Sequence, residues 1–520
     1  MEALCPADLL IENVTVITMD PQFPKAFGIA IAKGKIVGLL PSSSSSWPLT
    51  PTGLRMNGNN LVILPGLIDA HCHLRALLSQ NNAVSCTSQD VRSIADILKA
   101  IHSKTLQVST STWIRAFGYD VSQLDENRHP TRYDLDKVAL EHPVRLRHVT
   151  RHVSILNSVA LNIAGISANT VDPPGIHIER NSETNEPTGM IHGGDAWLSQ
   201  HIVPNATYSE LQKGVPNLKT RLLKYGITAV LDATPTNRLE DAKFWYTALQ
   251  NNWPITIQLM TDFEQHVEVA AYIKQELPCY FREKLEIGHI KIVMEALPEI
   301  VPTLDNLSKL GQEAFERDGS SLAIHVVDPE MTWTAIEAIR QIQSRFPNAH
   351  HQHRFEHLSL SPEAFLPDIA ALGIRVVTNP SLIYDHGDRY LADVEVSEHE
   401  WLYRMQSLYE AGIAMAAGSD APVASLNPWL GIQTACTRKT SKQQAVNPKE
   451  ALDRWNALHL YTAGAAEAAG WKNKRGMIKP GFQADLVAVN QNPLTYPIDK
   501  LHSIAVKATW IAGKLVFSDI

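Results

Sequence analysis

The sequence has no excess of basic residues, no paired cysteines and no long apolar run. Its 54 aspartates and glutamates outnumber its 46 lysines and arginines, which gives a net charge of −8. Proteins that bind nucleic acid need a basic stripe, so the composition argues against this class of partner. The five cysteines are odd in number and form no CxxC pair. Neither a disulfide framework nor a zinc knuckle is therefore expected.

No stretch approaches the roughly 18 consecutive apolar residues that a membrane helix requires. The first residues also lack the charged and apolar regions of a secretion signal. The length of 520 residues, with 44% hydrophobic and 19% charged, suffices for one large domain and a smaller one. We therefore expect a cytoplasmic protein that acts on a small molecule and binds neither nucleic acid nor a membrane; a homodimer stays open.

Between residues 64 and 470, short apolar segments alternate with helical ones, which is typical of βα units and a parallel sheet. Helices are predicted, for example, at residues 329–346, 361–372 and 397–411. The fold class is therefore α/β, a (β/α)8 TIM-like barrel with its active site at the carboxyl ends of the strands. The eight predicted strands lie within residues 64–73 and at residues 226–233, 255–260, 287–294, 322–327, 354–358, 375–379 and 414–420.

Both ends of the chain are rich in strands and lack helical periodicity. Residues 9–19 and 26–40 contain a Lys33-Gly34 turn, and residues 484–489 and 508–517 contain a Gly513-Lys514 turn. Because we find no such hairpins elsewhere, we predict a small β-sandwich built from residues 1–63 and 471–520. The barrel would occupy residues 64–470, with an insertion subdomain at about residues 75–215, an interval too long for one βα step.

The first barrel strand ends in two histidines, His71 and His73. In an extended strand alternate side chains share a face, so both imidazoles point one way and Cys72 the other. Two imidazoles on one face are half of a metal site. This pair alone is weak evidence in a chain with 21 histidines.

Later strand ends supply the remaining types of ligand. The fourth strand carries Lys291 and is followed by Glu295, and the fifth, sixth and eighth end near His325, His357 and Asp420. Each alone has an ordinary explanation, such as a core histidine, a snorkelling lysine or a helix N-cap. Their joint placement at one rim of a barrel favours a common site.

Five motifs carry a resemblance to a known family: residues 64–73 (LPGLIDAHCH), His325, Phe355-Glu356-His357, residues 418–422 (GSDAP) and the tail at residues 476–487. Together they resemble the metal-dependent amidohydrolase superfamily over nearly the whole chain. A segment in the insertion, with Arg151-His152-Val153 and residues 157–161 (NSVAL), is more narrowly similar to the branch that includes N-substituted formamide deformylases.

The resemblance implies a centre of one or two divalent metal ions. Two histidines and the aspartate would bind the first ion, two histidines the second, and a lysine carbamate formed with CO2 would bridge them. Imidazole and carboxylate ligands suit Zn2+, with iron or manganese as alternatives. The implied ligands are His71, His73 and Asp420 for the first ion, His325 and His357 for the second, and Lys291 for the bridge.

The implied reaction is hydrolysis of a C–N bond, in an amide or N-substituted formamide, by metal-activated water. Asp420 would carry the proton from the water to the leaving amine, and His152 would polarise the substrate carbonyl. Glu295 would contact the substrate or supply the bridging oxygen itself. The candidate pocket residues are Trp113, Tyr119, Tyr384 and Arg389.

Three alternatives stay open. A deaminase of a heterocyclic ring uses one metal and a His-x-x-Glu motif, of which His325-x-x-Asp328 is a shortened version, but it needs no bridging lysine such as Lys291. A lactone or ester hydrolase would use the same groups on another bond. A non-enzymatic protein with this fold ranks last, because all the expected types of ligand are present.

Overall fold

The chain folds into two compact units. One joins Met1–Leu74 with Asn217–Ile520, and the other is Arg75–Pro216. The computed structural model describes residues 5–81, 83–87, 90–149, 153–173, 175–194, 197–199, 202–204, 206–295 and 300–519. In this part of the chain, every helix is too short or too polar to cross a bilayer.

Eight parallel strands form a nearly closed barrel in the larger unit. Each strand pairs with the next along the chain, and the first and last meet where Asp420 N donates to His71 O (2.7 Å) and His73 N to Ala421 O (2.8 Å). The predicted α/β barrel is confirmed. Its strands are β6 (Leu67–Cys72), β13 (Ile227–Asp232), β14 (Thr256–Thr261), β15 (Leu285–Val293), β16 (Leu322–Val326), β17 (Arg354–His357), β18 (Arg375–Thr378) and β19 (Met415–Ala417).

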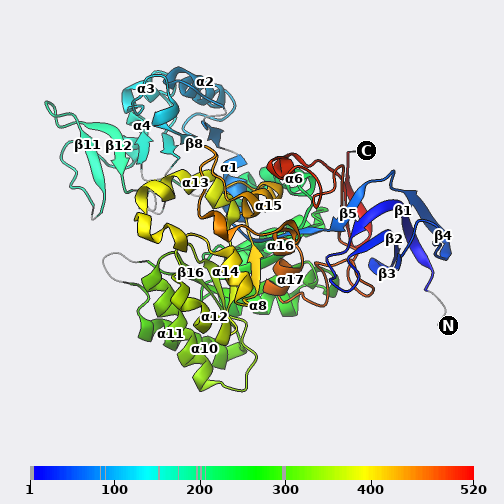
Figure 1. Ribbon diagram of the computed structural model, residues 1–520. Helices are drawn as coiled ribbons and strands as arrows, with labels where there is room; N and C mark the ends of the chain where they lie inside the picture. The colour runs from blue at the N-terminus through cyan, green and yellow to red at the C-terminus, as the bar shows by residue number, and fades with distance from the viewer. Residues whose placement is uncertain are drawn as a thin grey trace. The chain divides into compact units, whose positions relative to one another are not determined.

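The barrel strands are buried on both faces. Every residue of β6, β13 and β14 is buried, as expected of parallel strands that are filled inside by side chains and covered outside by helices. Figure 1 shows α10, α11 and α12 grouped beside β16. The main helices are α7 (Leu239–Gln250), α10 (Leu304–Asp318), α11 (Pro329–Arg345), α12 (Leu366–Ala371), α13 (Pro380–Asp393), α14 (Met405–Glu410), α15 (Pro428–Thr437), α16 (Arg454–Leu460) and α17 (Ala463–Ala468).

Two predicted helices are shorter than expected. Residues 361–372 hold a 3-10 turn (Glu363–Phe365) that precedes α12, and residues 397–411 hold another (Val396–Trp401) that is separate from α14. The hydrophobic pattern marks the apolar side of such segments, but it does not distinguish one continuous helix from two short turns.

Strands from both ends of the chain share one sheet. Ile11, Ile29, Ile63, Leu486 and Trp510 belong to one buried cluster, so the two terminal segments bury each other's apolar side chains. The structure shows one sheet of eight strands, seven along one path and β4 paired with β1 beside it, and the second layer of the predicted sandwich stays a prediction. The strands are β1 (Ala7–Ile17), β2 (Lys25–Ala32), β3 (Lys35–Leu40), β4 (Leu49–Asn57), β5 (Val62–Pro65), β20 (Leu486–Val489), β21 (Val506–Ile511) and β22 (Lys514–Ser518).

The two predicted terminal turns join antiparallel strands. Lys33 (φ 49°) and Gly34 (φ 76°) connect β2 to β3, and positive φ at both central residues is what a tight hairpin requires. At the other end the turn is Ala512 (φ 48°) and Gly513 (φ 73°), one residue earlier than predicted, because Lys514 already belongs to β22.

The inserted unit has a sheet of its own, which the sequence did not predict. Its described strands run in the order β11-β12-β10-β9-β8-β7, with antiparallel pairs β9–β10, β10–β12 and β11–β12. The expectation that hairpins occur only near the termini is therefore wrong. The strands are β7 (Val84–Ser85), β8 (Ile114–Tyr119), β9 (Val144–His148), β10 (Val153–Leu156), β11 (His177–Arg180) and β12 (Pro187–His192), with helices α2 (Ile94–Thr105), α3 (Arg132–Asp136) and α4 (Ser158–Ile163).

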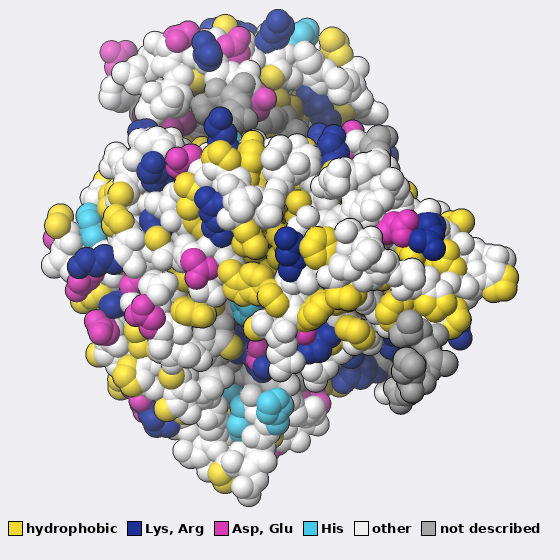
Figure 2. Space-filling view, turned by 45° about the vertical axis from the view of Figure 1, so that its right-hand side comes forward, with side chains coloured by type: hydrophobic (Ala, Val, Ile, Leu, Met, Phe, Trp, Pro, Cys, Tyr) yellow, Lys and Arg dark blue, Asp and Glu magenta, His cyan; other side chains and the backbone are white. Residues whose placement is uncertain are grey.

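The surface carries charges of both signs. On the face drawn in Figure 2, Lys and Arg side chains lie among Asp, Glu and hydrophobic ones. This mixture agrees with the modest net charge of −8.

Candidate metal centre

Two histidines lie at the carboxyl end of β6. His71 is 1% exposed, and His73 follows the strand directly. Cys72 points to the other side, where its thiol donates to Leu231 O (3.7 Å). A Cβ at Gly418 would lie only 2.4 Å from His71 N, so the glycine allows β19 to approach the histidine strand. The alternation places both imidazoles together, as a strand requires.

Asp69 holds the first and last barrel strands in register near the histidines. Its carboxylate accepts hydrogen bonds from Ser419 N (2.9 Å), Ser419 Oγ (2.6 Å) and His71 N (3.2 Å). Burial raises the pKa of Asp69 to about 6, although the bonds from Ser419 oppose that shift. Because Ser419 directly precedes Asp420, this contact fixes the aspartate relative to His71.

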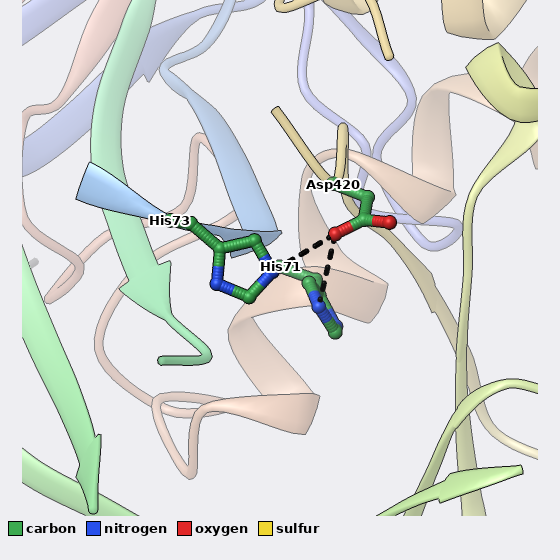
Figure 3. A group of neighbouring side chains, drawn as sticks. All are labelled: His71, His73 and Asp420. Carbon is green, nitrogen blue, oxygen red and sulfur yellow. Dashed lines mark hydrogen bonds and ion pairs between the residues drawn. The ribbon is translucent and has the colours of Figure 1, made fainter. Parts of the chain in front are cut away.

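Asp420 completes a group of three ligand atoms (Figure 3). Its Oδ1 lies 3.0 Å from His73 Nε2 and 3.4 Å from His71 Nε2, and the three ligand atoms lie within 4.8 Å of one another. Burial raises the pKa of Asp420, but the bonds from His71 and His73 outweigh it and hold the pKa well below its usual value. Two imidazole nitrogens and an ionised carboxylate are a donor set that zinc, iron or manganese accepts, so these residues fit a divalent metal.

In three of the four predicted histidine ligands, the Nδ1 atom has a hydrogen-bonding partner. Nδ1 of His71 contacts Glu356 Oε2, that of His73 lies 3.1 Å from Thr234 Oγ1, and that of His357 lies 2.8 Å from Asn379 Oδ1. Asn379 Nδ2 donates to Gly418 O, so its Oδ1 is the acceptor for His357 Nδ1–H. A partner on Nδ1 fixes the ring and leaves Nε2 available to a metal.

The second predicted pair, His325 and His357, continues the group. Ring centroids are 4.7 Å apart for His71 and His357, and 4.6 Å apart for His357 and His325. Burial, together with the nearby Lys291 and His71, lowers the pKa of His325 to about 4, so its imidazole stays neutral at physiological pH. Neutral imidazole is the form that binds a metal.

Lys291 is buried beside these histidines without a hydrogen-bond partner. Its side chain is on β15, the residue is 3% exposed, and its Nζ is an unsatisfied buried atom. Burial lowers the pKa of Lys291 to about 8, partly opposed by the charge of Glu356. A buried, unpaired amine is costly, so its presence at this rim indicates a function rather than a packing role.

A buried ion pair supports the site from within β17. Arg354 Nε lies 2.5 Å from Glu356 Oε1, both side chains are fully buried, and the other carboxylate oxygen contacts His71. Burial raises the pKa of Glu356, but Arg354, Lys291 and His71 outweigh it and hold the pKa well below its usual value. This pair was not predicted as part of the site, although two opposite charges at positions i and i+2 of a buried strand were a usable signal.

Replacing this carboxylate should destabilise the protein. A Glu356→Gln variant leaves Arg354 buried without its counter-charge, and the free energy of unfolding should fall by about 3 kcal/mol. Urea unfolding monitored by circular dichroism measures the change. Glu363→Gln is the control: Glu363 is paired with Arg404 at 3.2 Å but its side chain is 82% exposed, so the loss should stay below about 1 kcal/mol. Equal losses in the two variants would contradict the importance of the buried pair.

A sequence profile of the amidohydrolase family matches residues 56–517. The chain belongs to the amidohydrolase family. The match spans the barrel and, in the terminal sheet, β5, β20, β21 and most of β22, so all of the strand-end residues described above lie within the matched range.

Individual relatives agree with this membership. This amidohydrolase is 27% identical to an N-substituted formamide deformylase from Arthrobacter pascens, over 98% of each chain. Its fold matches an uncharacterized metal-dependent hydrolase from Pyrococcus furiosus with a TM-score of 0.72, 20% identity and coverage of 94% of this chain and 100% of the other. A similar protein from Pyrococcus horikoshii OT3 gives a TM-score of 0.74 at 19% identity, with coverage of 94% and 99%.

The other predicted residues of this amidohydrolase are more scattered. His152 lies outside the described residues. Glu295 is exposed, and its backbone pairs with Val301 (2.9 Å). Trp113 packs against an apolar cluster of the inserted unit, and the buried Tyr119 hydroxyl lies 2.9 Å from His129 Nδ1.

Two predicted pocket residues lie on α13. Tyr384 is half-buried, and its backbone carbonyl accepts a hydrogen bond from Ser441 N. Arg389 is exposed and faces Asp393 one turn further on (3.7 Å). The structure gives no hydrogen bond or ion pair between either of these described side chains and the histidine group, so their role as pocket residues stays a prediction.

Proposed function

We propose that this amidohydrolase cleaves the C–N bond of an open-chain amide, with N-substituted formamides as the first class to test. The observation that carries the proposal is the convergence of four histidines and Asp420 around a buried, unpartnered Lys291. The similarity to a formamide deformylase over 98% of both chains supports the choice of substrate class.

In this proposal the strand-end residues hold one or two divalent ions. His71, His73 and Asp420 would hold the first, and His325 and His357 would hold the second. Lys291, as a neutral amine, would add to CO2 and release a proton, and its carbamate would offer oxygen ligands to a metal ion. The Nζ of Lys291, which has no hydrogen-bond partner among the described residues, supports this assignment. Carboxylation would turn the buried amine into a negatively charged group that can pair with a metal cation.

The chain's own residues manage the protons of the reaction. A divalent ion bound here supplies Lewis acidity and lowers the pKa of water. One oxygen of Asp420 faces the two imidazoles and the other points away from them in Figure 3, free to accept a proton. Asp420 takes the proton from the attacking water and returns it to the amide nitrogen, so that the amine leaves in neutral form. The products are an amine and formate or another carboxylate.

Ring deamination is the less favoured alternative. It would require Asp328, three residues after His325, to serve as the proton-carrying acid. The carboxylate of Asp328 instead caps α11, where its Oδ1 accepts a hydrogen bond from Met331 N (2.8 Å). An N-cap in this position is already committed to its helix.

A substrate screen tests the proposal. Purified protein loaded with zinc, iron or manganese is offered N-alkyl and N-aryl formamides, acyl amides, lactones, and aminopurine and aminopyrimidine rings. Release of an amine with formate or another carboxylate is expected from the open-chain amides. Ammonia release from the rings alone, or turnover of the lactones alone, would contradict the proposal.

A further inference from the structure

Three hydroxyl groups form a chain beside the metal centre. Ser359 Oγ donates to the hydroxyl of Tyr403 (3.1 Å), which lies 3.4 Å from the hydroxyl of Tyr390. Tyr403 is 2% exposed, whereas Tyr390, on α13, is only partly buried. Ser359 is also partly buried, so the buried Tyr403 hydroxyl lies between two partly accessible ends of the chain.

Backbone contacts place this chain next to the two loops that carry His357 and Asp420. Ser359 is two residues after His357, and its carbonyl accepts a hydrogen bond from Tyr403 N (2.9 Å). One turn before Tyr390 on α13, His386 Nε2 lies 3.1 Å from Val423 O, and Val423 N in turn donates to Asp420 O (2.8 Å). The face of α13 that presents Tyr390 is thus anchored to the Asp420 loop.

A buried arginine holds the backbone of the middle tyrosine. Arg438 is fully buried and donates to the carbonyls of Tyr403 (3.0 Å) and Leu402 (2.8 Å). Tyr403 itself has a left-handed backbone (φ 47°), which a tyrosine rarely adopts unless its surroundings impose it. The backbone of Tyr403 is therefore held by the fold before any ligand binds.

The hydrogen of the Tyr390 hydroxyl can serve a ligand at the end of this chain. Tyr403 accepts from Ser359, and either phenol can donate across the 3.4 Å between Tyr403 and Tyr390; when Tyr403 donates, the Tyr390 hydrogen is left for a further acceptor. Burial raises the pKa of both tyrosines, so both phenols keep their protons. Among the residues that the structure describes, Tyr403 is the one hydrogen-bond partner of the Tyr390 hydroxyl. Each donated bond also polarises the next hydroxyl, which strengthens the last donor.

We propose that the Tyr390 hydroxyl donates a hydrogen bond to the carbonyl oxygen of the amide substrate, with Tyr403 and Ser359 as positioning residues. The inference rests on the proposed function, because it assigns a partner to the acyl oxygen of that substrate. Charge builds on this oxygen as the carbonyl is attacked, so a fixed donor binds the transition state more strongly than the substrate. Neither tyrosine was expected from the sequence, because the chain of hydroxyls joins three separate segments.

The test compares an amide with its thioamide analogue, because a thiocarbonyl sulfur is a poor hydrogen-bond acceptor. Tyr390→Phe should lower kcat/KM for the amide by about tenfold, the value of one hydrogen bond, and for the thioamide by no more than about twofold. Tyr403→Phe should lower it by a smaller factor and with the same preference for the amide. Tyr409→Phe, at a 50% exposed tyrosine of α14, is the control and should change neither value.

The outcomes separate this inference from the proposed function. Equal losses on amide and thioamide, or no loss in Tyr390→Phe while the wild-type protein hydrolyses amides, would overturn only the role of Tyr390. Wild-type protein that hydrolyses no amide would overturn both. Thermal unfolding of each variant shows whether a loss of rate comes from a loss of fold.

Discussion

An Asp420→Asn variant should lose about a thousandfold or more in kcat/KM, the range in which removal of a general acid–base group falls. The amide of asparagine cannot accept the proton of the attacking water or return it to the leaving amine. It is also a weaker metal ligand than the carboxylate, whose Oδ1 faces His71 and His73. Initial rates on the best amide from the screen, at saturating metal, measure the loss.

The fold should survive this change, because asparagine has nearly the shape of aspartate and the bond from the Asp420 backbone to His71 O is retained. The matched control is Asp393→Asn at the end of α13, where the side chain is 68% exposed and pairs weakly with Arg389. It should keep the wild-type rate. An Asp420→Asn variant that also kept the wild-type turnover would contradict the proposed mechanism.

Lys291→Met should separate activity from stability. Methionine replaces a buried, unpartnered amine with an apolar side chain of similar length, so the melting temperature should stay the same or rise. Activity should nevertheless fall by about a hundredfold or more. A loss of about a hundredfold is the largest that is typical when a residue supporting the metal ligands is removed. Differential scanning calorimetry and initial rates on the same samples measure the two effects.

The same variant tests the carbamate. Wild-type protein depleted of CO2 should lose activity and regain it when bicarbonate is added, whereas Lys291→Met should not respond. Lys309→Met, at a 76% exposed lysine of α10, is the control and should behave like the wild-type protein. Full activity in Lys291→Met would rule out a bridging role for this lysine.

Much of the barrel could be predicted from the sequence because its strands are buried on both faces and appear as short apolar runs. The predicted strand at residues 375–379 differs by one residue from β18, and that at residues 322–327 by one residue from β16. In a parallel barrel the carboxyl ends of all strands meet at one rim, so His71, His325 and Asp420 could be expected together despite their distance in sequence.

Other features depend on contacts that no local pattern reveals. Glu356 meets His71 across 285 positions of the chain, and the hydroxyls of Tyr390 and Tyr403 meet only because α13 and a separate loop pack together. The inserted unit itself was predicted, but its sheet was missed for a different reason: β7 has two residues and β10 and β11 have four each, too short to show an alternating pattern.

The metal content of the purified protein tests the central claim most directly. After loading with zinc, iron or manganese and removal of free metal, the wild-type protein should retain a divalent ion. His73→Ala, at a ligand position whose side chain is 24% exposed, should bind that ion about a hundredfold more weakly. His102→Ala, at an exposed histidine of α2, should bind it like the wild-type protein. A wild-type protein that retains none of these metals, or a His73→Ala variant that retains as much as the wild type, would contradict the account.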